Sequence, residues 1–265
     1  MSTLPVYQID AFSDQIFGGN PAAVCPLENW LDEGVMQAIA AENNLSETAF
    51  FAPVGDAADG RFGLRWFTPK VEVDLCGHAT LASSFLIMSR LHPELDNISF
   101  ETKSGRLDVS REGDRLVLDF PARVPSSAAV PAGFADAIGA EPVAFLKSVK
   151  NLAVYKSATD VFAIDPDFPY VANLDGDGLI VTAPGDDCDF VSRYFAPHAG
   201  INEDPVTGSA HCTLTPYWAE RLGKNNLRAR QVSERGGELL CELAGDRVRM
   251  AGCAVLYMEG VIHLP

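Results

Sequence analysis

Three features that would each place this chain in a definite class are missing from its sequence. There is no run of about eighteen apolar residues, the length that spans a bilayer, so we expect no membrane partner. Residues 1–5 show neither a basic region nor an apolar core, so we expect no secretion signal. The six cysteines form no Cys-x-x-Cys pair, so neither a zinc site nor a disulfide framework is predicted. Thiols without partners suit a reducing compartment, and we therefore expect a cytoplasmic protein.

Basic residues are also scarce. The chain has 20 lysines and arginines against 36 acidic residues, a formal net charge of −16, and no basic cluster. Because nucleic-acid binding depends on lysine and arginine contacts to phosphate, we expect no nucleic-acid partner. The 265 residues suffice for one large domain or two modest ones with a full core.

What the sequence does contain is one stretch and its echo. In both, a short polar turn with a glycine leads into an apolar helix: residues 74–80 (DLCGHAT) with the run to 91, and residues 204–210 (DPVTGSA) with the run to 222. When the two are aligned, Gly77 falls on Gly208 and His78 falls on Ser209.

Such a design can bind an anion. The first N–H groups of a helix lack partners within it, the helix dipole favours negative charge there, and glycine lets a ligand approach the backbone. Two ordinary buried helices with glycine turns would explain either stretch alone. The repeat, with polar side chains beside both glycines, favours a binding site for a small acid.

Each half of the chain runs from strands through the glycine turn and a long helix to a meander of short strands. Three prolines and two serines in residues 121–131 predict a linker. We therefore expect an N-terminal domain over residues 1–120, completed by a C-terminal strand over residues 253–265, and a C-terminal domain over residues 121–252. The first long helix is apolar on nearly every side, so it must be enclosed. Residues 161–164 are predicted as a strand.

Glu47 is the residue that the sequence indicates most strongly as a catalytic group. It alternates with Leu45, Ala49 and Phe51 along a predicted strand, so the alternation that buries these three turns Glu47 inward. A desolvated carboxylate has a raised pKa and is a usable general acid and base. His78 directly follows Gly77 at a helix start, a position that favours the neutral imidazole.

Several stretches resemble the phenazine-biosynthesis PhzF-like family, in order and over the whole chain: residues 8–12, 19–22, 44–50, 74–80 and 202–210. The resemblance implies the α+β fold of diaminopimelate epimerase. In that fold, two similar domains related by a pseudo-two-fold axis each wrap a mixed, barrel-like sheet around a central helix, and the active site lies in the cleft between them. The resemblance also implies homodimers, and it implies that no cofactor is used.

The family's catalytic glutamate falls on Glu47, and its assisting residues fall on His78, Asp204 and Ser209. The resemblance therefore implies a cofactor-independent isomerase, of the phenazine-biosynthesis type, that transfers a proton within a small carboxylic acid. The residues predicted to bind this anionic substrate are Asn20, Cys76, Gly77 and Gly208.

Two alternatives stay open. Relatives of this fold that epimerise amino acids use two facing thiols, and Cys76 stands at the first thiol position, whereas Thr207 stands at the second. A racemase or epimerase that pairs Cys76 with a carboxylate is therefore one alternative. The other is a non-catalytic protein that keeps the pocket as a small-ligand site.

No metal is predicted. Residues 173–178 (NLDGDG) resemble the start of a calcium loop, but Pro184 stands at the twelfth position, where the loop needs glutamate.

Overall fold

The computed structural model describes residues 2–264, which divide into two compact units. The first unit comprises the described residues up to Asp119 together with those from Ala251 onward, and the second comprises Phe120–Met250. Among the described residues, no helix has both the length and the apolar character that crossing a membrane requires.

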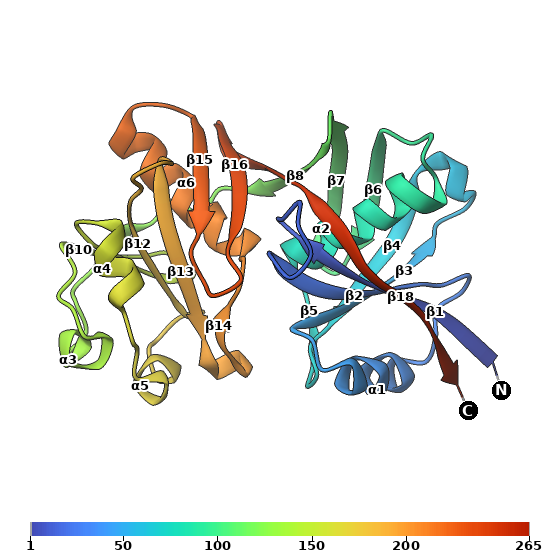
Figure 1. Ribbon diagram of the computed structural model, residues 1–265, viewed down its shortest axis with the longest axis horizontal. Coiled ribbons are helices and arrows are strands. Elements are labelled where there is room, and N and C mark those ends of the chain that lie inside the picture. Colours follow the sequence, from blue (N-terminus) through green and yellow to red (C-terminus); the bar gives the residue numbers. More distant parts are fainter. Residues whose placement is uncertain (1, 265) are drawn as a thin grey trace. The chain divides into compact units, whose positions relative to one another are not determined.

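The first unit is built from a mixed sheet and two main helices. Its elements are β1 (Ser2–Ala11), β2 (Asn20–Pro26), α1 (Glu33–Asn43), β3 (Glu47–Pro53), η1 (Ala57–Asp59), β4 (Arg61–Phe67), β5 (Glu72–Val73), α2 (Gly77–Leu86), η2 (Ile87–Leu91), β6 (Asn97–Thr102), β7 (Gly105–Glu112), β8 (Arg115–Pro121) and β18 (Ala254–Leu264). The two ends of the chain meet in this unit, because β18 pairs antiparallel along the whole of β1 (Figure 1).

The second unit repeats the plan with more short helices. Its elements are β9 (Ser126–Ser127), α3 (Phe134–Ile138), β10 (Ala144–Lys147), β11 (Asn151–Val154), α4 (Ala158–Ala163), α5 (Phe168–Ala172), β12 (Leu179–Pro184), β13 (Phe190–Ala196), η3 (Pro197–Ala199), β14 (Ile201–Asp204), α6 (Gly208–Leu222), β15 (Asn226–Gln231), β16 (Gly237–Ala244) and β17 (Arg247–Gly252).

The strand pairings of the two units follow the same order. In the first unit, β1–β2 is antiparallel, β2–β3 parallel and β3–β4 antiparallel, and β4 then pairs antiparallel with β5 and parallel with β6. In the second unit, β10–β11, β11–β12 and β12–β13 repeat this sequence, and β13 pairs antiparallel with β14 and parallel with β15. The long helix follows the short strand β5 or β14 in both. The internal duplication inferred from the sequence is therefore confirmed in the strand pairing.

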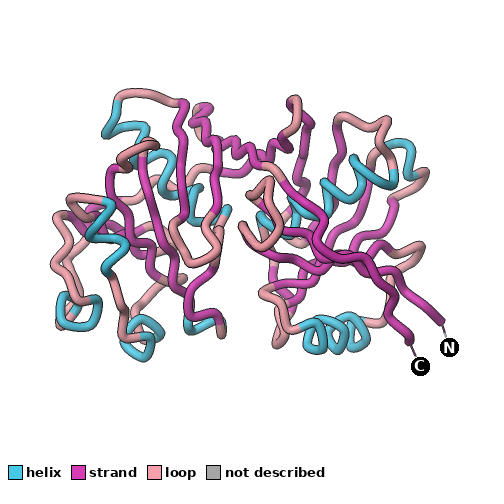
Figure 2. The backbone as a smooth tube through the Cα atoms, viewed as in Figure 1, coloured by secondary structure: helices cyan, strands magenta, loops and turns pink. Residues whose placement is uncertain are grey.

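A central helix lies among the strands of each unit (Figure 2). Every residue of α2 from Gly77 to Ser84 is buried. Its three hydroxyl side chains are satisfied inside the helix, because Thr80, Ser83 and Ser84 each donate to the carbonyl four residues earlier. The helix can therefore be enclosed without leaving these polar groups unpaired.

Pro216 lies inside α6, where it has no N–H to donate to the carbonyl of Cys212. The backbone N–H of Arg123 donates to that carbonyl instead, at 2.8 Å. The segment that follows β8 thus repairs the gap in the helix, which explains how a proline is tolerated there.

Two predictions of local structure are wrong. Residues 161–164 belong largely to α4 rather than to a strand, because Ser157 and Asp160 form a capping box that starts a helix. Leu45 does not share a face with Glu47. Asn44 takes a left-handed conformation that ends α1, the strand begins only at Glu47, and Leu45 packs against the cluster that contains Phe50.

The acidic turn at residues 173–178 is neutralised by lysines. The ammonium of Lys147 contacts Asp175, and that of Lys150 contacts Asp177, each at 2.5 Å. Two side-chain cations therefore supply the positive charge that a calcium ion supplies in the loop this turn resembles.

Candidate active site

Glu47 stands at the first position of β3, a strand whose next five residues are buried. The strand lies parallel to β2, with Glu47 opposite Ala22. Its side chain is only 13% exposed, and Oε2 lies 3.3 Å from Nε2 of His78. The inward direction predicted for Glu47 is therefore correct, although the start of the strand, and not alternation from Leu45, sets it.

His78 and Cys76 come from the start of α2. Cys76 is the N-cap residue, and its side chain makes no capping hydrogen bond. Its Sγ turns instead toward the imidazole and lies 3.5 Å from Nδ1 of His78. Both side chains are buried, at 6% and 4% exposure. The short turn before the helix thus directs a thiol and an imidazole toward the carboxylate of Glu47.

Asn20 completes this cluster from the first position of β2. Its Nδ2 lies 3.1 Å from Nδ1 of His78, and the residue is fully buried. The preceding Gly19 has φ +65°, and a Cβ there would lie 2.2 Å from the carbonyl oxygen of Ala11. Only glycine can therefore hold the turn that places Asn20 beside the imidazole.

The imidazole of His78 is neutral. Burial lowers its pKa from 6.5 to about 3, because charging it inside the unit would cost its hydration. The amide nitrogen of Asn20 can only donate, so Nδ1 is the acceptor and the single ring proton sits on Nε2, facing Glu47. The carboxylate therefore has a neutral proton donor beside it instead of a cation.

Glu47, Cys76 and His78 also form a potential metal-binding group. One ligand atom from each residue lies within 4.8 Å of the others. Sequence spacing did not reveal this group, because Glu47 reaches it from a strand that is distant in the chain. The absence of a bound metal stays a prediction, although three side chains that could hold an ion lie close together here.

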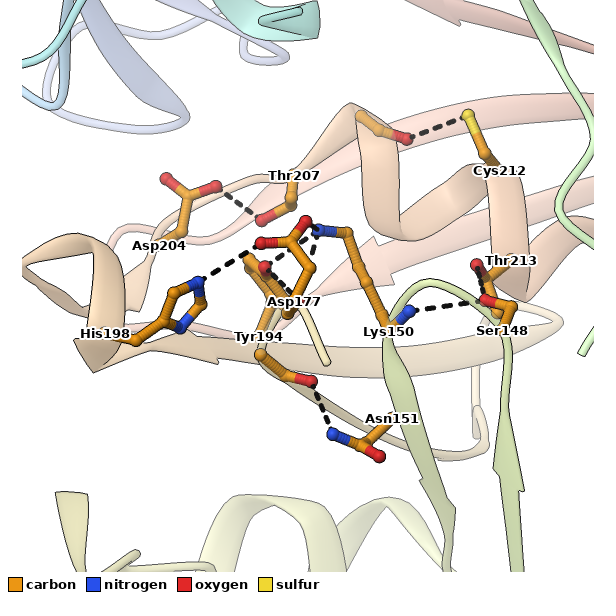
Figure 3. A network of polar contacts seen from close by, with 12 residues as sticks. Ser148, Lys150, Asn151, Asp177, Tyr194, His198, Asp204, Thr207, Cys212 and Thr213 are labelled. Carbon is orange, nitrogen blue, oxygen red and sulfur yellow. Dashed lines mark hydrogen bonds and ion pairs between the residues drawn. The ribbon is translucent and has the colours of Figure 1, made fainter. Parts of the chain in front are cut away.

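The second set of predicted residues lies in the second unit, around the start of α6. Asp204 ends β14 and is 8% exposed. Its Oδ2 accepts a hydrogen bond from Oγ1 of Thr207 at 2.5 Å (Figure 3). Gly208 is the first residue of the helix, Ser209 is partly exposed beside it, and no side chain caps this end.

Gln231 on β15 holds this turn, and sequence reasoning missed it. Its Oε1 accepts from the backbone N–H of Thr207 at 2.8 Å, and its Nε2 donates to the carbonyl oxygen of Asp204 at 2.7 Å. One buried amide thus fixes the backbone on both sides of the turn. No local motif marks Gln231, because the contact depends on the pairing of β15 with β13.

A second polar network, around the buried Lys150, lies next to the strand of Asp204. Lys150, at 5% exposure, contacts the Asp177 carboxylate and donates to the hydroxyl of Tyr194 at 2.8 Å. His198 contacts the same carboxylate at 3.2 Å (Figure 3). Tyr194 stands opposite Asp204 in the β13–β14 pair. The network therefore connects the acidic turn to the strand that carries Asp204.

His211 makes acid stability a testable property of this unit. It is fully buried, and its Nδ1 lies 2.8 Å from the carbonyl oxygen of Thr207. Burial lowers its pKa from 6.5 to about 4, whereas in the unfolded chain the imidazole takes up a proton below pH 6.5. The contribution of the neutral histidine to the free energy of unfolding is therefore fully present above pH 6.5. It is lost as the pH falls toward 4, by about 1.4 kcal/mol per pH unit for each such histidine.

Denaturant unfolding between pH 7 and 4 measures this slope. The His211→Asn variant keeps a nitrogen donor for Thr207 and removes the titrating ring. We expect a lower stability at pH 7 and a shallower loss on acidification, with His78 supplying the remainder. A variant with the full wild-type slope would contradict the assignment of the pH dependence to His211.

Comparisons with known proteins give a family model and several similar proteins. A family model described as phenazine biosynthesis-like protein, PhzC-PhzF, matches residues 9–260. A Pseudomonas aeruginosa protein named as an uncharacterized isomerase is 51% identical, over 98% of this chain and 99% of its own length.

Solved structures with a similar fold identify the fold class of this chain. The crystal structure of a PhzF-family phenazine biosynthesis protein from Enterococcus faecalis has a TM-score of 0.95 and 45% identity, covering 99% of this chain and 100% of that one. A hydroxyproline epimerase from Agrobacterium vitis has a TM-score of 0.64 at 10% identity, covering 98% and 92%, which is a likeness of fold alone. The α+β, epimerase-like fold expected from the sequence is confirmed.

Proposed function

Because this chain belongs to the PhzC-PhzF family of phenazine biosynthesis-like proteins, we propose that it is a cofactor-independent isomerase of a small carboxylic acid. Isomerisation as the class of reaction is supported by relatives at 51% identity that carry that name. The proposal goes further by assigning a proton transfer between two carbon atoms to a single glutamate.

The observation that carries this proposal is the environment of Glu47. A carboxylate with 13% exposure, 3.3 Å from a buried neutral imidazole, is largely withdrawn from water and has no cation in that contact. Desolvation makes the protonated and ionised forms of a carboxyl group closer in energy. A group in that condition can take a proton from one carbon and return it to another.

The neighbouring residues would hold the substrate and steady the glutamate. His78 presents Nε2–H toward Glu47, and Asn20 fixes its ring through Nδ1. The start of α2 at Gly77 offers backbone N–H groups to a carboxylate, with Cys76 at its edge.

Residues of the second unit have matching roles in the proposal. Asp204 would orient polar groups of the substrate, and its hydrogen bond from Thr207 fixes the carboxylate. Ser209 and the N–H groups after Gly208 would bind an anionic group at the start of α6. We further propose that the active form is a cytoplasmic homodimer, as the family resemblance implies.

A thiol-dependent racemase or epimerase is the second candidate, and the position of Cys76 favours it. The thiol lies 3.5 Å from the imidazole of His78, whose ring also contacts Glu47. Two-sided proton transfer needs a second acid or base, and Thr207 occupies the corresponding turn of the second unit. The partner of Cys76 in such a mechanism would therefore have to be a carboxylate.

Solvent deuterium tests the proposal. Small acids that raise the melting temperature of the protein are first selected, since a ligand specific to the folded state stabilises it. Each is then incubated with enzyme in deuterated water and followed by NMR. We expect deuterium in a product whose double bond or hydrogen has moved to another carbon.

Other outcomes of this experiment contradict the proposal. Deuterium at an unmoved carbon with inverted configuration would indicate a racemase. Stabilising ligands that stay unlabelled and unchanged would indicate a non-catalytic binding protein. The Glu47→Gln variant, incubated in parallel, shows whether labelling depends on the glutamate.

A further inference from the structure

We propose that Glu47, Cys76 and His78 form a Zn²⁺ site, and that Zn²⁺ bound there reversibly switches off the isomerase. The binding of the metal is inferred from the side chains alone. The inhibitory consequence rests on the proposed function, because it requires Glu47 to be the catalytic base.

The spacing of the three ligand atoms suits a small tetrahedral ion. Zinc–ligand bonds of about 2.0 to 2.3 Å place neighbouring ligand atoms about 3.3 to 3.6 Å apart in a tetrahedral site. The observed contacts are 3.5 Å from Sγ of Cys76 to Nδ1 of His78, and 3.3 Å from Oε2 of Glu47 to Nε2. A metal binds only one of the two ring nitrogens of His78. When one ligand atom is taken from each residue, the three atoms lie within 4.8 Å of one another. Side-chain rotations of about 1 Å would therefore close the site.

The chemistry of the ligands selects the ion. A thiolate, an imidazole and one carboxylate suit zinc, whereas calcium and magnesium prefer all-oxygen sites. Zinc deprotonates a thiol that binds it, so Cys76 would carry a negative charge in the complex. With the Glu47 carboxylate, two negative charges would then balance Zn²⁺. A neutral complex is the form that a largely buried site can hold at the lowest desolvation cost.

The surroundings already orient the ligands. Cys76 and His78 are carried by one turn at the start of α2, and both are buried, at 6% and 4% exposure, so the thiol and the imidazole are held close together. Asn20 contacts the imidazole from the opposite strand at 3.1 Å. If zinc takes Nε2, the ring proton moves to Nδ1, and rotation of the Asn20 amide would present its oxygen there as the acceptor that usually supports a metal-bound histidine.

Bound zinc would act on the reaction through Glu47. A carboxylate oxygen that is coordinated to a cation cannot accept a proton from carbon, and the substrate would meet an ion where it needs a base. With three protein ligands, a fourth position stays open to water. The ion can therefore leave when a chelator or a competing thiol lowers its concentration, which makes the inhibition reversible.

Cobalt(II) is the direct probe of binding, because it takes the same ligands and its thiolate complex absorbs light. Chelator-treated wild-type protein is titrated with Co²⁺ under reducing conditions, and Zn²⁺ is then added. We expect a thiolate-to-cobalt charge-transfer band that saturates at one ion per chain and disappears when Zn²⁺ displaces the cobalt.

Three variants locate the band. Cys76→Ser should abolish it, and Glu47→Gln should weaken binding while retaining the thiolate signal. Cys253→Ser, which removes a partly buried cysteine of the same unit outside the cluster, should change nothing. A wild-type protein without the band, or a Cys76→Ser protein that keeps it, would overturn the site.

Inhibition is measured separately, once a substrate is known. The ratio of the rate without Zn²⁺ to the rate with equimolar Zn²⁺ should exceed 10 for wild type and Cys253→Ser, because removal of a catalytic base costs about 10²-fold or more. This ratio should return to 1 after chelation. For Cys76→Ser it should stay near 1. A rate that is unchanged or raised by Zn²⁺ would overturn the inhibitory role. Cobalt binding in a protein that isomerises nothing would contradict only the proposed function.

Discussion

Replacement of Glu47 by glutamine is expected to lower turnover by about 10²- to 10⁴-fold, the contribution typical of a general acid–base group. The amide keeps the shape of the side chain and removes the atom that accepts the proton. Ligand binding should survive, because a neutral amide costs less to bury than a carboxylate. The amide can also keep the contact with Nε2 of His78, which spans 3.3 Å in the wild type.

The measurement compares kcat and ligand affinity of the variant with those of wild type. Glu47→Asp is the second variant, and it should also be slow because the shorter side chain withdraws the carboxylate from its position. Melting temperatures of both variants control for folding. Undiminished turnover in Glu47→Gln would remove the glutamate from the chemistry.

Cys76→Ser separates the two catalytic hypotheses. If Glu47 is the base, the serine variant should retain much of the rate, with any loss explained by the contact of Sγ with Nδ1 of His78 at 3.5 Å. If the thiol is the base, this variant should be inactive. A dead Cys76→Ser beside an active Glu47→Gln would assign the reaction to the thiol.

The sequence predicted the parts of the fold that depend on local pattern. The apolar run after Gly77 and the run after Gly208 both became enclosed helices, α2 and α6. Hydrophobic periodicity is a property of neighbouring residues, so it can be read without knowing what the helix packs against. The capping box at Ser157 and Asp160 is equally local, and it was overlooked in favour of the β-branched residues that follow it.

The candidate site shows where sequence reasoning ended. Sequence reasoning singled out Glu47, His78 and Asn20, and in the structure these three lie in one cluster. Neither Gln231 nor Lys150 carries a motif, because each acts through a strand pairing that joins distant segments. The backbone partner of Cys212 was missed for the same reason, since Arg123 lies in the predicted linker, distant from Cys212 in the sequence. Contacts of this kind require coordinates.

Replacement of Asp204 by asparagine is expected to lower kcat by about 10²-fold, the loss that follows when a substrate or reacting group is misplaced by about 1 Å. The fold should be unaffected, because Gln231 binds the backbone carbonyl of Asp204 and not its side chain. The asparagine oxygen can still accept from Thr207, but the negative charge that is proposed to orient the substrate is gone.

Thr207→Val is the matched control for this prediction. Valine preserves the shape of threonine and removes the hydroxyl that donates to Asp204 at 2.5 Å and accepts from Nε2 of Gln231 at 3.1 Å. The carboxylate therefore stays charged but is held less firmly. We expect a fall in kcat of about 10-fold or less, since one hydrogen bond contributes about 1 kcal/mol.

Deuterium exchange into the substrate decides the role of Asp204. If the residue only orients the substrate, exchange and net isomerisation should fall together in Asp204→Asn while Glu47 still performs both. Exchange that continues at the wild-type rate while isomerisation stops would instead show that Asp204 itself delivers the returning proton, and the assignment of both transfers to Glu47 would be wrong.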